Sequence, residues 1–448
     1  MPVCPLDYRY GTPEMKAIFS EDARIDYLLR IEGALALAHE EFSHIPQGYG
    51  NAINEKASVR HVSPARVNEI EGRTKHDIMA LVLALSEAVG EPSSGYIHLG
   101  ATSSDILDSA TALQIRDANI IILRRVIEIT QALSELALRT EDTICIGRTH
   151  GQHAIPMTFG FKVGVWAMEM KRHHTRFLEL RPRVEVGKMS GAVGTGAAFG
   201  DNSIELEKRT MEILGIGTEE ISTQIVQRDR YVELVGFMAN LATTLEKIAT
   251  EIRNLQRTEI NEIREHFDTA GQVGSSTMAQ KVNPITCENV CGLARIIRSM
   301  VIPTMENAIL WHERDLANSS AERFLIPHSY VLLDDILGKM TSVIAGLSVN
   351  VEIMSDNIEI SRGLCMAESV MMAMARKGVS REHAHEIIRK ISLECRNESI
   401  HLRDGLARNR EILELFSESE LSEVLDPGSY LGHIRKKIAK YIGPMQER

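Results

Sequence analysis

An unbroken heptad pattern between residues 229 and 264 constrains the fold of this chain more than any other feature. Its apolar residues step along the chain by 4, 3, 4, 3, 4 and 3 positions: Leu234, Met238, Leu241, Leu245, Ile248, Ile252 and Leu255. That spacing places them on one stripe of an α-helix, and the whole segment would be about 50 Å long as a helix. Because such a helix is too long for a small globule, we expect it in an elongated bundle or between subunits.

Helical periodicity continues in four further segments, which are residues 110–139, 157–180, 287–305 and 329–349. Aromatic residues make up only 5% of the 448 residues, which favours helices over sheets. Both ends of the chain hold shorter helical stretches broken by Pro and Gly. We therefore predict an all-α protein with three parts, namely an N-terminal helical domain at 1–106, a central long-helix bundle at 107–354 and a C-terminal helical domain at 355–448.

Charge and cysteine usage exclude several classes of function. The formal net charge is −11, and the sequence holds no Lys/Arg-rich run, so we expect neither a nucleic-acid nor an anionic-membrane surface. No apolar run approaches about 18 residues, and the first residues do not resemble a signal peptide. Cys287 and Cys291 alone are closely spaced, without further ligands at zinc spacing. The sequence predicts a soluble cytoplasmic protein with reduced thiols and no bound metal.

Four polar segments between the expected helices carry more Gly, Ser, Thr and His than a connector needs: 98–110, 147–156, 222–229 and 274–284. In the second, His150 is either a hydrogen-bonded loop histidine or a general acid or base. His153 follows three residues later, but no third ligand accompanies the pair. His76 precedes a helical pattern, where a capping or core role is favoured over a catalytic one.

Hydroxyl and arginine side chains mark two helix starts. Thr102 and Ser103 precede an apolar run, where they can cap the helix and also help its N-terminus hold a carboxylate. Arg314 and Arg323 flank Ser319 and Ser320 in a second segment. These residues form either a solvated helix start or a pocket for a phosphate or carboxylate.

The combination of motifs resembles the fumarase/aspartase superfamily of lyases over nearly the whole chain. The shared motifs are GSS-x-M-x-x-K-x-N-P at 274–284, GRTHGQHA at 147–154 and TSSD at 102–105. Within the superfamily, the adenylosuccinate lyase family is most similar, through RYG at 9–11, KHD at 75–77, TQIVQRD at 223–229 and ERDLANSSAER at 313–323. The resemblance implies a three-domain fumarase/aspartase-like fold whose long helices form a tetrameric core. It further implies active sites built from three subunits, and neither a metal nor an organic cofactor.

The family reaction is an anti β-elimination that releases fumarate from adenylosuccinate, giving AMP, and from SAICAR, giving AICAR. The resemblance makes Ser275 the base, His150 the acid and Glu288 the group that orients His150, while His76 assists proton transfer. The small-molecule substrate would be bound by Arg9, Tyr10, Lys75, Asp77, Thr102, Ser103, Gln224, Ser276, Lys281, Asn283, Asn289, Arg314, Ser319, Ser320 and Arg323. The mobile loop of such an enzyme must exclude water and stabilise the negative charge that develops.

The 274–284 segment departs from the family pattern at Ala279, Gln280 and Val282. Ala279 stands where proline is usual, and Gln280 resembles argininosuccinate lyases. Our hypothesis is that elimination is retained while loop closure or substrate preference is altered. The alternative functions are another superfamily lyase or cycloisomerase with a different N-succinyl or carboxylate substrate, or a non-catalytic relative of the lens-crystallin kind. The last is disfavoured because Ser275, His150, Lys281 and Asn283 are all present.

Overall fold

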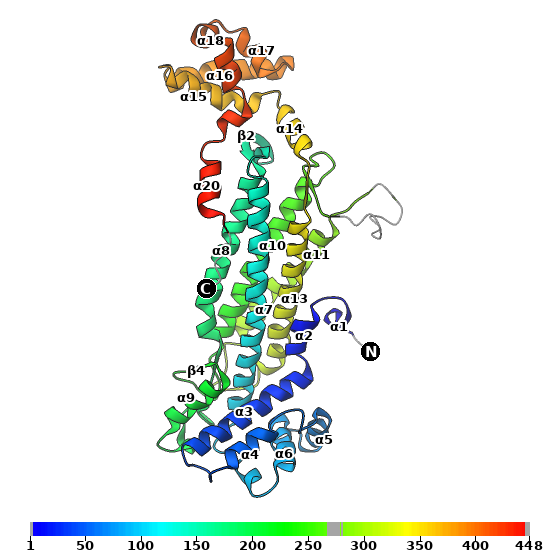
Figure 1. Cartoon of the computed structure of the whole chain (residues 1–448), viewed down its shortest axis with the longest axis vertical. Coiled ribbons are helices and arrows are strands. Elements are labelled where there is room, and N and C mark those ends of the chain that lie inside the picture. Colours follow the sequence, from blue (N-terminus) through cyan, green and yellow to red (C-terminus); the bar gives the residue numbers. More distant parts are fainter. Residues whose placement is uncertain (1–2, 267–277, 279–280, 444–448) are drawn as a thin grey trace. The chain divides into compact units, whose positions relative to one another are not determined.

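The protein is all-α with a few short strands, as the computed structural model shows for residues 3–266, 278 and 281–443 (Figure 1). Helices α7 (Ser103–Arg139), α8 (Phe159–Val184), α10 (Asp229–Leu255), α11 (Ile285–Ser299) and α13 (Ser319–Ala345) form in the segments predicted as long helices, although α11, with 15 residues, is shorter than the 21-residue α3 (Glu21–Glu41). These correspond to the five segments expected from the sequence. The predicted all-α fold is thereby confirmed.

Helix α10 forms because its heptad residues have a core to pack against. Leu234, Leu241, Leu245 and Ile248 are fully buried, and Phe237 stacks on Phe177 of α8 at 5.1 Å between ring centroids. The helix is shorter than the predicted 229–264 and ends at Leu255, where the apolar pattern itself stops. The chain then turns, and Asn261 takes a left-handed φ of 50°, which ends helical geometry.

Two other helix boundaries differ from expectation. The segment predicted at 287–305 is two helices, α11 and α12 (Val301–Glu306), divided at Met300. Pro303 lies in the first turn of α12, where its missing N–H is not needed. Helix α13 begins ten residues before the predicted 329 and continues through Pro327, so the tertiary contacts of this helix tolerate an internal proline.

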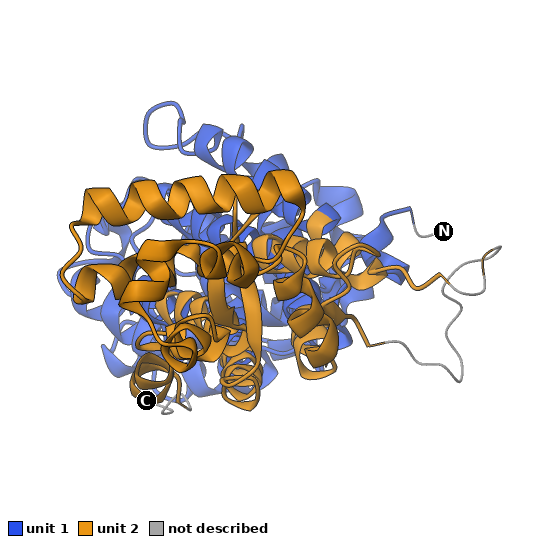
Figure 2. Cartoon of the chain, turned by 90° about the horizontal axis from the view of Figure 1, so that it is seen from above, with its two compact units in different colours: residues 1–126, 173–245, 292–338 blue, residues 127–172, 246–291, 339–448 orange. Residues whose placement is uncertain are grey.

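The chain forms two compact units, which Figure 2 distinguishes by colour. Unit 1 comprises residues 1–126, 173–245 and 292–338, and unit 2 comprises 127–172, 246–291 and 339–448. The residues of all five long helices are therefore divided between the units. The three-domain division drawn from the sequence stays a prediction.

In unit 1, the N-terminal helices pack around the first turns of α7. Its buried cluster joins Leu29 and Leu35 of α3 with Leu81 of α6 and Leu113 of α7. The remaining helices and strands of the unit are α1 (Pro5–Tyr8), α2 (Pro13–Ile18), α3 (Glu21–Glu41), α4 (Tyr49–Lys56), α5 (Pro64–Thr74), α6 (Asp77–Val89), α9 (Ser203–Leu214), β3 (Val186–Gly187) and β4 (Gly217–Thr218). The short strands β3 and β4 pair in parallel.

In unit 2, the C-terminal helices enclose a second core that includes Val370, Met374, Ile388 and Leu402. These helices are α14 (Val351–Glu359), α15 (Ala367–Arg376), α16 (Arg381–Glu398), α17 (Leu402–Ala407), α18 (Arg410–Leu415), α19 (Glu418–Val424) and α20 (Ile434–Tyr441). The strands are β1 (Ile144–Thr149), β2 (Gln152–Thr158), β5 (Ile263–Arg264) and β6 (Ser348–Val349). Both strand pairs are antiparallel.

The β1–β2 hairpin was not predicted from the sequence, which indicated a polar loop over 147–156. Across the described part of the chain, no helix has the length and apolar character needed to span a bilayer. All six cysteines are free thiols, and all except the half-buried Cys4 are buried. Burial raises the pKa of Cys145 to about 12, so this thiol stays protonated and unreactive near neutral pH.

Candidate active site

The first group of predicted site residues lies in unit 2, where His150 occupies the tip of the β1–β2 hairpin. Thr149 pairs with Gln152, which leaves His150 and Gly151 as a two-residue turn. Both have positive φ, 53° for His150 and 73° for Gly151. Two-residue hairpin turns with two positive φ values are of type I′ and favour Asn-Gly. An exposed histidine here stores backbone strain, a feature that concentrates at functional sites.

A buried ion pair supports this turn from below. Arg148, two residues before His150, donates to both carboxylate oxygens of Glu262, at 3.1 and 2.6 Å. The Glu262 side chain is only 1% exposed, and it also accepts a hydrogen bond of 2.9 Å from Asn357 of α14. The bidentate geometry fixes the orientation of the β1 end, and thus of the histidine that follows it.

The predicted Lys281, Asn283 and Glu288 line a second feature of unit 2, a cavity of about 890 Å³. Arg253, Arg257 and Arg264 line it too, so it carries an excess of cationic side chains. Such a lining is suited to a dicarboxylate. Ser275, Ser276, Ala279 and Gln280 lie outside the described residues.

The start of α11 is fixed by two side chains that the sequence analysis did not single out. The buried Glu265 carboxylate accepts from the backbone N–H groups of Thr286, at 3.2 Å, and Cys287, at 2.7 Å. Gln256 donates to the carbonyl of Val282 and accepts from the N–H of Glu265. These bonds hold Glu288 in the exposed first turn of the helix. Within one chain, Glu288 makes no hydrogen bond to His150 among the described residues.

Asn289, the next residue on α11, was predicted to contact substrate. Its side-chain oxygen accepts a 2.7 Å hydrogen bond from Lys339 of α13. The two N–H donors of the Asn289 amide take no part in this bond.

In unit 1, the predicted arginine–serine group gathers around one cavity of about 360 Å³. Arg314, Ser319 and Arg323 all line it, together with Ser104 from the TSSD segment. The exposed Ser320 and the half-buried Thr102 and Ser103 do not. Guanidinium and hydroxyl donors converging on one cavity are suited to a phosphate or carboxylate.

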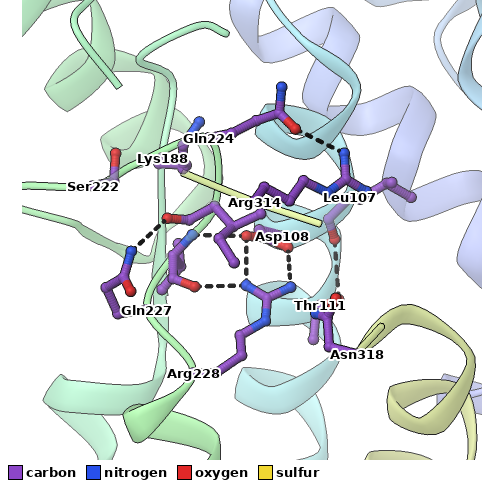
Figure 3. Close-up of polar contacts among 12 residues, drawn as sticks. Leu107, Asp108, Thr111, Lys188, Ser222, Gln224, Gln227, Arg228, Arg314 and Asn318 are labelled. Atoms are coloured by element: carbon purple, nitrogen blue, oxygen red, sulfur yellow. Dashed lines mark hydrogen bonds and ion pairs between the residues drawn. The ribbon is translucent and has the colours of Figure 1, made fainter. Parts of the chain in front are cut away.

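Arg228 connects three elements beside this cavity (Figure 3). Its two terminal nitrogens donate to the two oxygens of Asp108 on α7, at 2.8 and 2.9 Å. The Nε atom donates to Glu322 of α13 at 2.8 Å. The Arg228 side chain is 6% exposed. Burial alone would lower its pKa, but the charges of Asp108 and Glu322 hold the pKa well above the usual arginine value.

Gln224 links Arg314 to a neighbouring loop. Its oxygen accepts from Arg314 at 2.9 Å, and its nitrogen donates to the Ala192 carbonyl at 3.0 Å. Figure 3 shows the hydrogen bond between Gln224 and Arg314. The predicted substrate-binding glutamine therefore also orients a predicted substrate-binding arginine.

The KHD segment forms the junction of α5 and α6. Lys75 ends α5 with a left-handed φ of 57°, and His76 caps α6 by accepting from the Met79 N–H at 3.2 Å. The capping role that the sequence favoured for His76 is thus observed. Asp77 pairs with Arg24 at 3.5 Å, and Arg24 lines the unit 1 cavity.

Arg9 and Tyr10 follow the short helix α1. Arg9 is exposed and Tyr10 is half-buried, and neither lines the unit 1 cavity. Within a single chain, the structure brings Arg314 and Arg323 together but not Arg9.

Two buried ion pairs beside the TSSD segment escaped the sequence analysis. Lys188 and Asp105 are both fully buried and form an ion pair, and Asp105 also accepts from the Thr102 N–H at 2.8 Å. His98 donates through Nδ1 to the Glu32 carboxylate at 2.7 Å. Glu32 lies on α3 and is 1% exposed. His98 stands in the quoted segment 98–110, but its distant partner gives no local signal.

Comparisons with known proteins define the class of the chain. A family model described as "Lyase" matches residues 7–298, and a second, described as "Adenylosuccinate lyase C-terminus", matches residues 363–441. Among solved structures, a fumarate lyase from Mesorhizobium sp. BNC1 superposes with a TM-score of 0.89 and 32% identity, covering 99% of this chain and all of the other. The 3-carboxy-cis,cis-muconate lactonizing enzyme from Pseudomonas putida superposes with a TM-score of 0.88 and 30% identity over 98% of each chain.

The fold and these matches define a lyase of the all-α fumarase/aspartase type. An adenylosuccinate lyase from Archaeoglobus fulgidus is 47% identical over 442 residues, which is 99% of this chain and 98% of the relative. The chain belongs to the adenylosuccinate lyase family. Among the described residues, no group of three or more His, Cys, Asp or Glu side chains is arranged to hold a metal ion.

Proposed function

We propose that this lyase removes fumarate from adenylosuccinate to give AMP, and from SAICAR to give AICAR, by anti β-elimination. The observation that carries the proposal is the 47% identity to an adenylosuccinate lyase over 99% of the chain. The geometry supports it through the unit 1 cavity, where Arg314, Ser319 and Arg323 offer donors to a nucleotide phosphate. The unit 2 cavity offers Lys281 and Asn283 to the succinyl carboxylates.

The proposed mechanism divides the chemistry between two groups. Ser275 takes the proton from the carbon next to a carboxylate, and His150 protonates the leaving nitrogen. The exposed position of His150 at a strained turn supports its role, because a functional group at such a turn is presented to substrate by the scaffold below it. The negative charge that develops on the carboxylate is stabilised by Lys281 and neighbouring donors.

We further propose a homotetramer in which each active site combines residues of three subunits. The supporting observation is that Arg9 does not line the unit 1 cavity that Arg314 and Arg323 line. Glu288 would then orient His150 across a subunit boundary. Residues Lys75, His76, Asp77, Thr102, Ser103, Ser276, Asn289 and Ser320 complete the proposed site. The cytoplasmic location stays a prediction.

The test is an absorbance assay of purified protein with adenylosuccinate, followed by Ser275→Ala and His150→Ala. Loss of the proton-transfer group should lower kcat by about 10²–10⁴-fold in each variant. A matched control is His153→Ala, three residues from His150 on the same hairpin, which should retain most of the activity. Absence of turnover in the parent enzyme, or equal loss in all three variants, would contradict the proposal.

The alternative function, that of a cycloisomerase, is opposed by the 47% identity to an adenylosuccinate lyase and by the match of the adenylosuccinate lyase C-terminus model to residues 363–441. A cycloisomerase would act on a carboxylate substrate without a phosphate. Turnover of carboxymuconate but not of adenylosuccinate would support that alternative.

A further inference from the structure

The unit 1 cavity contains acidic as well as basic side chains, which raises the question of how it could attract an anion. Four arginines line it, namely Arg24, Arg228, Arg314 and Arg323, and so do three acids, namely Glu21, Asp108 and Glu322. A carboxylate close to a bound phosphate repels it, and the repulsion is strong where solvent is partly excluded. Whether each carboxylate is free to repel the phosphate therefore matters more than the numbers of acids and arginines that line the cavity.

Arg228 occupies two of these three carboxylates. It takes both oxygens of Asp108, at 2.8 and 2.9 Å, and both oxygens of Glu322, at 2.8 and 3.2 Å. Asp108 accepts a further bond from the Val226 N–H, and Glu322 accepts one from Asn318. Every oxygen of the two acids is thereby satisfied within the protein.

Arg314 and Arg323, by contrast, form no ion pair with an acidic side chain among the described residues. Arg314 is bonded to the uncharged amide of Gln224. Arg323, next in sequence to Glu322, makes no hydrogen bond or ion pair with any residue that the structure describes. Glu322 lines the same cavity as Arg314 and Arg323, so without Arg228 its carboxylate would be free to act on the two arginines or on their ligand.

We propose that Arg228 is a positioning residue that holds Asp108 and Glu322 away from Arg314 and Arg323, so that these two arginines can bind the phosphate of the substrate. The inference rests on the proposed function, which supplies a phosphate-bearing nucleotide as the ligand. All three guanidinium nitrogens of Arg228 are already bonded to Asp108, Glu322 or the Val226 carbonyl, so the proposal gives Arg228 no direct contact with the phosphate. Arg228 acts by engaging the oxygens of the two acids in hydrogen bonds, which keeps these carboxylates from pairing with Arg314 and Arg323.

A purely structural role for Arg228 makes a different prediction. Removing a buried arginine that joins α7, α10 and α13 would disturb every ligand equally, and no second substitution at Glu322 would selectively recover phosphate binding. The two roles are separated by comparing two ligands. Inorganic phosphate would bind in the unit 1 cavity, whereas fumarate would bind in the unit 2 cavity proposed for the succinyl carboxylates.

The experiment measures the dissociation constants of inorganic phosphate and of fumarate by calorimetry with the full chain. Arg228→Met should weaken phosphate binding by about tenfold and leave fumarate within about twofold. Adding Glu322→Gln to Arg228→Met should recover at least about threefold of the phosphate affinity, because the unmasked charge is removed. Equal weakening of both ligands, or no recovery in the double variant, overturns the proposal.

A second pair of variants keeps the proposal testable if Arg228→Met does not fold. Glu322→Gln alone should change phosphate affinity by less than about twofold, because Arg228 already masks that charge. Glu21→Gln is the matched control, since Glu21 lines the same cavity and makes no ion pair with a described residue. It should tighten phosphate by about threefold. Equal effects of the two substitutions, whether large or absent, overturn the proposal.

These measurements need no turnover, so the two ideas can fail separately. Phosphate binding that follows the expected pattern in a protein without activity on adenylosuccinate would contradict the proposed function alone. Full activity on adenylosuccinate, combined with equal weakening of phosphate and fumarate binding or no recovery in the double variant, would contradict the role of Arg228 alone.

Discussion

Arg148 and Glu262 form a bidentate ion pair two residues from the strained turn that carries His150. The pair joins β1 to the residue immediately before β5, and Asn357 adds a third bond to the carboxylate. A side chain at a hairpin tip has few packing contacts of its own. Its position is therefore set by the strands below it, and Arg148 anchors the end of β1 through two hydrogen bonds to one buried carboxylate.

The first prediction concerns this pair. Arg148→Met leaves the Glu262 carboxylate buried and unpaired by a cation, so we expect a loss of about 3 kcal/mol in the free energy of unfolding and a fall in kcat of about tenfold or more. Urea unfolding and the adenylosuccinate assay measure the two effects. Arg148→Lys is the control, because it keeps the charge but not the two-pronged guanidinium. Its free energy of unfolding and its kcat should lie between those of the parent and of Arg148→Met. A stable Arg148→Met enzyme with unchanged kcat would contradict the positioning role.

A second prediction separates stability from activity at the turn. Asparagine adopts positive φ more easily than histidine and is favoured in type I′ turns. His150→Asn should therefore raise the free energy of unfolding by about 0.5–1 kcal/mol while abolishing most of the activity. Thermal unfolding and the activity assay on the same sample test both halves.

Gly151→Ala is the control for that prediction. It places a side chain at a φ of 73°, and should destabilise the hairpin by about 1 kcal/mol. If His150→Asn proved no more stable than the parent, the turn would not be under the strain that its backbone angles indicate.

The long helices could be predicted from the sequence because their signal is local and repeated. The heptad residues of α10, from Leu234 to Leu255, are all buried as their spacing indicated. The hairpin was not predictable in the same way, because its turn pairs glycine with a histidine, which is not a usual turn residue. Only the pairing of Thr149 with Gln152 reveals it.

The candidate site likewise contains residues that the sequence indicated and residues that it did not. The TQIVQRD segment pointed to Gln224, which the structure places on Arg314. It gave no reason to single out Arg228, whose partners Asp108 and Glu322 lie 120 and 94 residues away in sequence. Lys188 and Glu32 were missed for the same reason, since a buried charge is recognised only by a partner that tertiary packing supplies.

A third prediction concerns the buried pair of Lys188 and Asp105. Lys188→Met removes the cation and leaves Asp105 with only backbone donors, including the Ser190 N–H at 3.1 Å. We expect a loss of about 3–5 kcal/mol in the free energy of unfolding. The double variant Lys188→Met/Asp105→Asn should recover part of it, because no buried charge then remains. Urea unfolding at fixed protein concentration gives both values, and a double variant less stable than Lys188→Met would contradict the charge argument.

The last prediction is a pH dependence that depends on Glu32 and His98. Burial would lower the pKa of His98, but the hydrogen bond and charge of Glu32 outweigh burial and leave that pKa raised. The folded state thus holds the proton more tightly than the unfolded state, where the histidine pKa is about 6.5. The resulting stability is fully present below about pH 6.5 and is lost as pH rises through the folded-state pKa.

His39 acts in the opposite direction, since burial lowers its pKa, and its contribution is lost as pH falls below about 6.5. The effect of His98 is therefore isolated by comparing the parent with Glu32→Gln across the same pH range. The stability difference between the two proteins should shrink as pH rises above about 6.5, because only the parent loses the charged pair. Urea unfolding at each pH measures it, and a difference that stays constant or grows with pH would show that His98 is not held in its protonated form by Glu32.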